Sequence, residues 1–347
     1  MKEINSSINQ LKELSVIIGK NKKFIQASGG NTSFKSGNKI WVKASGKQLK
    51  NAFNEDIFVC LENINSSENL IDTDLKDIIF KSVGINSLKE SIESFLHAVM
   101  PHKYVIHSHA LDVIRESVII DNFGSLSLNM SEYNCEFVNY KEPGMKLAKE
   151  VFANIKDKDI DVVILLNHGL IVGAESAKEV VYKHNKIVEK FYRKSRKIPK
   201  LDNDKLNQII SKLKDKTGMF WRLPKSNLIH TLGTDNWSFT IAKKLPLYPD
   251  HIVFCGQQAL CLADDDFTKI DKETMINQKY IIVKDIGVFL NERSTFATEE
   301  MLEGQAYINL SIPIGVKIKT LTKSQCLDIS ELDSEKYRIN MIKNTKK

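Results

Sequence analysis

Two histidines stand two positions apart in an apolar segment, a spacing that can bind a metal ion. His107 and His109 belong to residues 104–109, which the pattern predicts as a buried strand. Because alternate side chains of a strand point to the same face, both imidazoles can reach one ion. His168 follows a second apolar strand, at residues 161–166, and is a third candidate ligand. Three imidazoles leave a fourth position open, as in a catalytic zinc site, although a His-x-His pair taken alone is more often incidental.

A carboxylate precedes the first histidine strand. Glu93 and His97 share one face of a helix predicted over residues 90–99, which Pro101 ends. Apolar neighbours surround Glu93 in the sequence, and such surroundings raise the pKa of a carboxyl group. We interpret Glu93 as a general acid/base; the alternative is a solvated helix residue with Glu90 facing inward. His97 is either a ligand or a buried histidine that hydrogen-bonds one.

A glycine-containing loop carries neutral donors. Residues 28–33 read SGGNTS, and residues 44–46 read ASG. Paired glycines let the backbone approach a ligand closely, while amide and hydroxyl groups suit a phosphate. The alternative is an ordinary hairpin turn, and the histidines make phosphate binding the better interpretation.

Helices and strands must hold these side chains, and the apolar periodicity predicts both. A hairpin turn at residues 36–38 separates two short strands. Mixed elements of this kind predict a layered α/β domain. The predicted helices cover residues 4–25, 90–99, 145–155 and 177–192, and the predicted strands cover residues 32–34, 39–43, 104–109 and 161–166.

The composition limits the class of protein. With 42% hydrophobic and 27% charged residues among 347, the chain is that of a soluble globular protein of one or two domains. A net charge of +7 comes without a basic block, so we expect no nucleic-acid partner. Five cysteines without a CxxC pair predict no disulfide framework. We also expect no membrane span and, lacking an apolar start, a cytoplasmic protein.

The second half of the chain is similar to the first. Residues 194–204 are polar and contain Pro199, which predicts an exposed connection between a domain at 1–200 and a domain at 201–347. Beyond it, residues 280–290 align with 162–172, and residues 249–257 align with 101–109. We interpret residues 201–347 as an α/β domain that is a degenerate copy of the first. This copy lacks the metal-binding types, with Trp237 for Glu93, Cys255 for His107, Gln257 for His109 and Ile286 for His168.

Five motifs together resemble one family, the class II aldolase/adducin family, in the family's own order. They are GNTS at 30–33, KASG at 43–46, SIE at 91–93, HSHA at 107–110 and NHG at 167–169. The resemblance covers roughly residues 8–195. It is strongest to the aldolase part of bifunctional rhamnulose-1-phosphate aldolase/alcohol dehydrogenases, although no GxGxxG motif occurs in this sequence.

The resemblance implies a layered class II aldolase-like α/β/α domain, a homo-oligomer and a sugar-phosphate substrate. It implies Zn²⁺, with Co²⁺ or Mn²⁺ as substitutes, on His107, His109 and His168, and Glu93 as the catalytic acid/base. Ile92 stands where fuculose-type aldolases have a second serine, and their catalytic tyrosine has no clear match, Tyr133 and Tyr140 being candidates. The implied substrate-binding residues are Asn31, Thr32, Ser33, Ser45, Gly46 and Ser91.

The implied activity is cleavage or formation of a carbon–carbon bond in a ketose 1-phosphate through a metal-stabilised enediolate. Pentulose-phosphate 4-epimerases and sugar-phosphate dehydratases use the same constellation, and the rhamnulose-type resemblance favours the aldolase. A non-enzymatic adducin-like scaffold is the alternative of a different class. Adducin-type heads typically lack the metal histidines, and this chain has all three.

Overall fold

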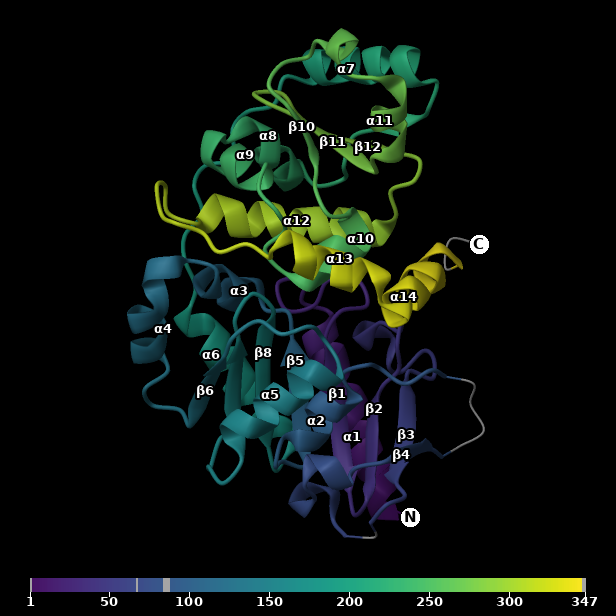
Figure 1. Cartoon of the computed structure of the whole chain (residues 1–347), viewed down its shortest axis with the longest axis vertical. Coiled ribbons are helices and arrows are strands. Elements are labelled where there is room, and N and C mark those ends of the chain that lie inside the picture. The colour runs from purple at the N-terminus through teal and green to yellow at the C-terminus, as the bar shows by residue number, and fades with distance from the viewer. Residues whose placement is uncertain (1, 67, 84–87, 345–347) are drawn as a thin grey trace.

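The computed structural model describes residues 2–66, 68–83 and 88–344, and it shows two lobes (Figure 1). An eight-stranded sheet forms the first lobe, in the order β4-β3-β2-β1-β5-β8-β7-β6. All neighbouring strands are antiparallel except β6 and β7. The strands are β1 (Asn31–Ser36), β2 (Lys39–Lys43), β3 (Phe58–Asn63), β4 (Phe80–Ser82), β5 (Tyr104–Ser108), β6 (Cys135–Val138), β7 (Val162–Leu165) and β8 (Gly169–Ala174).

Helices cover both faces of this sheet. On one face, α1 (Lys2–Gly19) and α6 (Ala177–Lys190) enclose an apolar core with the strands, and on the other α2 (Ser94–Val99) and α5 (Met145–Ile155) enclose a second core. Two further helices, α3 (Leu111–Ser117) and α4 (Phe123–Asn129), follow β5. The predicted α/β layered fold is therefore confirmed for the first lobe.

A smaller sheet forms the second lobe, in the order β10-β11-β12-β9. Its strands are β9 (Trp221–Arg222), β10 (Leu260–Leu262), β11 (Tyr280–Val283) and β12 (Gly287–Asn291). Its helices are α7 (Asn203–Thr217), α8 (Thr231–Thr234), α9 (Asn236–Ala242), α10 (Pro249–Cys255), α11 (Lys272–Asn277) and α12 (Phe296–Ser311).

The end of the chain returns to the first lobe. In Figure 1, α10, α12 and α13 (Lys323–Glu331) lie between the two sheets, and α14 (Asp333–Asn344) reaches the end of the first lobe near β1 and β2. A Cβ added to Gly46, which follows β2, would lie 3.0 Å from the Met341 side chain of α14. The last helix therefore packs directly against the ASG loop.

One part of the predicted duplication is wrong. Residues 249–255, aligned with the strand β5, form the helix α10. Pro249 occupies the first helical turn, where its fixed φ is favourable, and Asp250 places a negative charge at the helix N-terminus. The two halves do share the β7–β8 and β11–β12 hairpins with the helices that follow them, and the parallel pairs β6–β7 and β10–β11 beside these hairpins.

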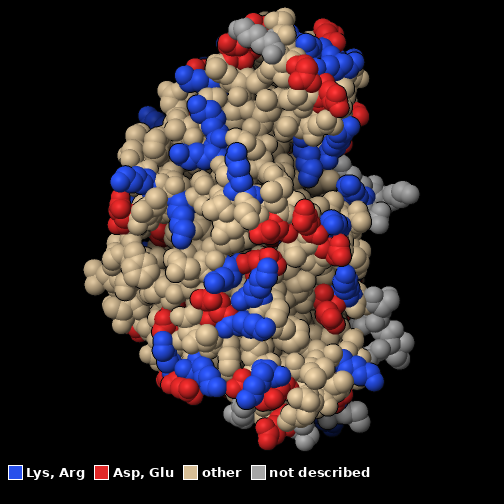
Figure 2. Space-filling view, viewed as in Figure 1, with Lys and Arg blue, Asp and Glu red and all other residues tan. Residues whose placement is uncertain are grey.

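Side chains of both charges are visible on the face drawn in Figure 2, and over much of that face Lys and Arg side chains lie near Asp and Glu side chains. Among the residues that the structure describes, none belongs to a helix long and apolar enough to cross a membrane.

Candidate metal centre and active site

Three histidines and one glutamate meet at the end of the large sheet. Each of Glu93, His107, His109 and His168 offers a ligand atom within 4.8 Å of the others, and all four residues are buried. The ring centroids of the three imidazoles lie 5.0 to 5.1 Å apart. The structure thus brings together the residues that the sequence predicts as ligands and acid/base.

Successive side chains of the strand β5 point to opposite faces of the sheet. Val105 faces the core beneath α2, whereas Ile106 faces the core beneath α6. His107 follows the first pattern, and Ser108 follows the second, donating to or accepting from His184 of α6 at 2.8 Å. Strand geometry therefore places His107 on the metal side, as its spacing predicts.

The turn between β7 and β8 delivers His168. Asn167 has a left-handed φ of 58°, a conformation that asparagine tolerates better than most residues. Its side-chain amide donates to the carbonyls of Leu247 (2.9 Å) and Lys319 (3.0 Å), so residues from the second half of the chain hold this turn. A Cβ at Gly169 would lie 2.2 Å from the Ser108 carbonyl oxygen, which explains the glycine.

The imidazole nitrogens suit a divalent transition metal. Nδ1 of His107 lies 3.2 Å from the Leu170 carbonyl oxygen. Because a carbonyl accepts a hydrogen bond, it favours a proton on Nδ1 and leaves Nε2 available to bind a metal ion. Nε2 of His107 and Nε2 of His109 are buried and lack a hydrogen-bond partner. Burial lowers the pKa of His168 to about 3, with a further contribution from His107, so this imidazole is neutral at pH 7. Neutral imidazoles with unpartnered nitrogens are what a zinc-type ion requires.

Glu93 lies directly beside these nitrogens. Its Oε1 is 3.4 Å from His107 Nε2 and 3.5 Å from His168 Nε2, and its Oε2 accepts a 2.6 Å hydrogen bond from Asn31. Ser91 accepts a hydrogen bond from the Glu93 backbone N–H at 3.2 Å. The carboxylate is thus held in place and can serve either as a base or as a fourth ligand.

The predicted raised pKa of Glu93 is wrong. Burial acts to raise this pKa, but the surrounding imidazoles of His107, His168 and His109 outweigh burial and hold it well below its usual range. The sequence showed the apolar neighbours along the helix, whereas the histidines lie on or beside other strands. Glu93 is therefore an ionised carboxylate.

His97 does not belong to the ligand group. The helix begins at Ser94, later than predicted, with Glu93 as its N-cap. Nδ1 of His97 lies 2.8 Å from the Ser33 hydroxyl, and burial lowers the pKa of His97 to about 3. His97 is a buried neutral histidine that holds the β1 strand against α2.

A small polar pocket adjoins the four residues. Its free volume of ≈ 20 Å³ has room for about one water molecule. Four of the predicted substrate-binding residues line it, namely Asn31, Ser45, Gly46 and Ser91. Ser28, Gly30, Lys43, Ile92 and Pro143 also contribute to its wall.

Two predicted substrate-binding residues do not line this pocket. The hydroxyl of Thr32 points to the opposite face of β1 and lies 2.6 Å from the Ser15 hydroxyl of α1. Ser33 is engaged by His97. Thr32 faces away because alternate residues of a strand point to opposite faces of the sheet. The Ser33 hydroxyl already has His97 as a hydrogen-bond partner. A substrate contact of Thr32 or Ser33 stays a prediction.

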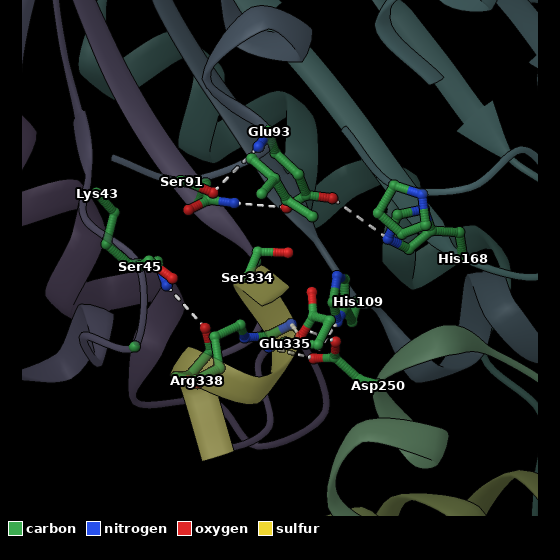
Figure 3. A pocket seen from close by; sticks show the side chains of 16 residues that line it. Lys43, Ser45, Ser91, Glu93, His109, His168, Asp250, Ser334, Glu335 and Arg338 are labelled. Carbon is green, nitrogen blue, oxygen red and sulfur yellow. Dashed lines mark hydrogen bonds and ion pairs between the residues drawn. The ribbon is translucent and has the colours of Figure 1, made fainter. Parts of the chain in front are cut away.

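Four residues of the second half also line the pocket, and sequence reasoning missed them. Figure 3 shows Asp250 of α10 with Ser334, Glu335 and Arg338 of α14 facing the metal residues. Asp250 Oδ2 lies 3.1 Å from His109 Nδ1. No local pattern in the sequence marks these positions.

Neither candidate tyrosine lines the pocket. Tyr140 packs against the core of the second lobe, and Tyr133 lies beneath the Lys190 ammonium, 5.7 Å from its ring centroid. A tyrosine that assists catalysis is therefore not assigned within the described residues.

Comparison with known proteins agrees with this fold and site. Residues 11–191, more than half of the chain, match the profile described as Class II Aldolase and Adducin N-terminal domain. The chain belongs to the class II aldolase/adducin family.

Individual relatives are more distant. An L-fuculose phosphate aldolase from Methanocaldococcus jannaschii is 28% identical over 43% of this chain and 75% of its own length. The uncharacterized oxidoreductase YuxG from Bacillus subtilis is 24% identical over 59% of this chain, and the match spans only 31% of that protein. A solved class II aldolase domain from Thermoplasma acidophilum is 27% identical, covers 53% of this chain and 91% of its own, and has a TM-score of 0.43.

Proposed function

We propose that this protein is a class II aldolase that cleaves or forms a carbon–carbon bond in a ketose 1-phosphate of the rhamnulose-1-phosphate type. The observation that carries the proposal is the cluster of Glu93, His107, His109 and His168 beside a pocket of neutral donors. Membership of the family and the similarity to an L-fuculose phosphate aldolase support it. The partial match to a protein named as an oxidoreductase supports the likeness to two-part aldolase/dehydrogenases.

The proposed cofactor is Zn²⁺ on His107, His109 and His168, with Co²⁺ or Mn²⁺ as substitutes. Imidazole ligands and a neutral protonation state favour zinc. When bound, such an ion polarises carbonyl and hydroxyl oxygens of a substrate as a Lewis acid.

The chain's own side chains supply the remaining chemistry. Glu93, ionised and oriented by Asn31, removes or returns the proton at the substrate carbon. Ser45, Gly46 and Ser91 line the pocket opposite, where hydroxyl and amide donors can hold a phosphate. Holding that phosphate fixes the reacting carbon relative to the Glu93 carboxylate.

The proposal extends to the organisation of the protein. We propose a catalytic domain at 1–200, a second domain at 201–347, assembly as a homo-oligomer and a cytoplasmic location. The pocket lining qualifies the domain division, because Asp250 and Arg338 lie beyond residue 200 and face the site. The catalytic unit therefore includes elements of both domains.

One experiment tests the function directly. The purified full chain is analysed for metal content and then screened against ketose 1-phosphates for release of dihydroxyacetone phosphate and an aldehyde. We expect about one zinc per chain and cleavage of at least one such sugar, both abolished in His107→Ala. A preparation that binds zinc but only interconverts pentulose phosphates, or only releases water from its substrate, would replace the aldolase with an epimerase or a dehydratase.

A further inference from the structure

The last helix of the chain covers the pocket with a charged face. Ser334, Glu335 and Arg338 of α14 line the pocket (Figure 3). Met341, about one turn further along α14, packs against Gly46. The Arg338 side chain is only 13% exposed. A guanidinium buried beside a metal centre, at the far end of the chain, requires an explanation.

Two carboxylates surround this guanidinium. Arg338 donates to both oxygens of Asp250, at 2.9 and 3.0 Å, and to Glu335 at 2.8 Å. Burial acts to lower the pKa of Arg338, but the carboxylates outweigh it, so the guanidinium stays charged. Asp250 takes two hydrogen bonds from Arg338 with both of its oxygens, whereas Glu335, from the same helix, takes one. Glu335 is thus the weaker of the two partners and the one that an incoming anion can replace.

Asp250 connects the guanidinium to the metal residues. Its Oδ2 lies 3.0 Å from Arg338 and 3.1 Å from His109 Nδ1. Gly29, in the loop before β1, leaves room for this contact. A Cβ at Gly29 would lie 2.5 Å from Asp250 Oδ2 and 2.8 Å from His109 Nδ1, too close for a larger residue. A carboxylate on the outer nitrogen of a ligating histidine fixes the ring orientation. Asp250 therefore holds both the ligand and the cation.

The pocket has few other permanent cations. Lys43 lines it, but burial lowers the pKa of Lys43 to about 7, and its ammonium already donates to the Ser28 and Lys47 carbonyls. Asn31, Ser45 and Ser91 are neutral. Arg338 is consequently the group that can supply full charge and paired donors to an anionic substrate.

We propose that Arg338 is a specificity-determining residue for the phosphate of the substrate, and that Asp250 is its positioning residue. This inference rests on the proposed function, because it deepens the assignment of a sugar-phosphate substrate. Binding exchanges the Glu335 contact of Arg338 for a contact with the phosphate.

The test measures phosphate binding apart from turnover. Zinc-loaded full-length wild type, Arg338→Gln, Arg338→Lys and Glu335→Gln are titrated calorimetrically with inorganic phosphate and with dihydroxyacetone phosphate. We expect Arg338→Gln to weaken both affinities about 10- to 100-fold, Arg338→Lys to lose less, and Glu335→Gln to tighten them. Arg222→Gln is the matched control, because Arg222 pairs with Glu299 in the second lobe, away from this pocket.

The outcomes separate this inference from the proposed function. If phosphate binding depends on Arg338 but no ketose phosphate is cleaved, the proposed aldolase activity is wrong and the role of Arg338 stands. If a folded, zinc-containing Arg338→Gln cleaves the substrate and binds phosphate as wild type does, the role of Arg338 is wrong and the aldolase activity stands. Should Arg338→Gln fail to fold, Glu335→Gln decides, since unchanged or weaker phosphate binding in that variant contradicts the exchange of partners.

Discussion

The two β-hairpins of this protein share a backbone and differ in chemistry. In both, antiparallel strands flank a turn whose residue has a left-handed φ, 58° at Asn167 and 57° at Asp285, and a glycine begins the return strand. The residue between turn and glycine is His168 in the first hairpin and Ile286 in the second. His168 faces the metal group, whereas Ile286 belongs to the apolar core of the second lobe.

The difference shows that the hairpin fixes where the turn residue lies, and that the neighbouring strands decide which side chains surround it. The strand β8 pairs with β5, which carries His107, whereas β12 pairs with the short β9, which carries no histidine. Cys255 belongs to a different buried cluster from Ile286, so the aligned positions of the second half do not gather around one point. A metal site requires the surrounding strands, and only the first hairpin has them.

The largest expected effect comes from exchanging the matched hairpin residues for alanine. His168→Ala removes a ligand, and we expect metal content and turnover to fall to background, measured by elemental analysis and a coupled assay. Ile286→Ala should keep metal and turnover but lower the free energy of unfolding by about 2–5 kcal/mol, since it leaves a cavity. Metal loss in both variants, or in neither, would end the distinction between the hairpins.

The next effect separates chemistry from metal binding within the first lobe. Glu93→Gln keeps the three imidazoles and the hydrogen bond to Asn31, so we expect metal and fold to be retained. Turnover should drop about 10² to 10⁴-fold, because the proton transfer is lost. Steady-state kinetics on metal-loaded protein provide the measurement, and a rate near that of wild type would exclude Glu93 from the mechanism.

A smaller effect is expected in the pocket. Ser45→Ala loses a neutral hydrogen bond, which predicts a rise of about 2- to 12-fold in the KM for phosphorylated ketoses and none for unphosphorylated ones. Thr32→Val is the control, because Thr32 faces Ser15 instead; it should lower stability and leave KM unchanged. Equal rises for both kinds of sugar in Ser45→Ala would contradict a phosphate contact.

The smallest effect concerns the second half's contribution to the site. Burial raises the pKa of Glu335 from 4.5 to about 7, with Arg338 lowering it and Asp250 and Glu93 raising it. Protonated Glu335 therefore adds stability that is complete below pH 4.5 and is lost as the pH rises through 7. We expect larger hydrogen-exchange protection factors in α14, corrected for the intrinsic exchange rate at each pH, at pH 5 than at pH 8, and a flatter dependence in Glu335→Gln. Identical pH profiles in the two proteins would show that Glu335 does not titrate there.

Local patterns predicted part of the first lobe, including the strands β1, β2, β5 and β7, whereas β3, β4, β6 and β8 were not predicted. The helix at 145–155 and the hairpin around Gly37 are confirmed, because apolar period and turn residues act over a few positions. The meeting of His107 and His109 was predictable for the same reason, since the alternation of a strand fixes the side that each residue faces. Pairing between distant strands decided the low pKa of Glu93, and no pattern within one segment contains that information.

The second half was harder to predict. Similarity to residues 101–109 indicated a strand at 249–257, but Pro249 and Asp250 begin a helix there. Arg338 lies far along the chain from His109, and its role depends on where α14 docks. An arginine on a solvated helix face and an arginine in a pocket have the same sequence pattern. Only the tertiary contacts of Arg338 therefore show that it lines the pocket.

The two hydrogen bonds that hold the Asn167 side chain have a consequence for the order of events during synthesis. The turn that carries His168 is held by the carbonyls of Leu247 and Lys319, which leave the ribosome well after the three histidines. While the chain is still growing, His107 and His109 are available but the third ligand has no fixed place. We expect nascent chains stalled before residue 319 to retain zinc poorly and released chains to retain it firmly, so that metal loading marks completion of the polypeptide.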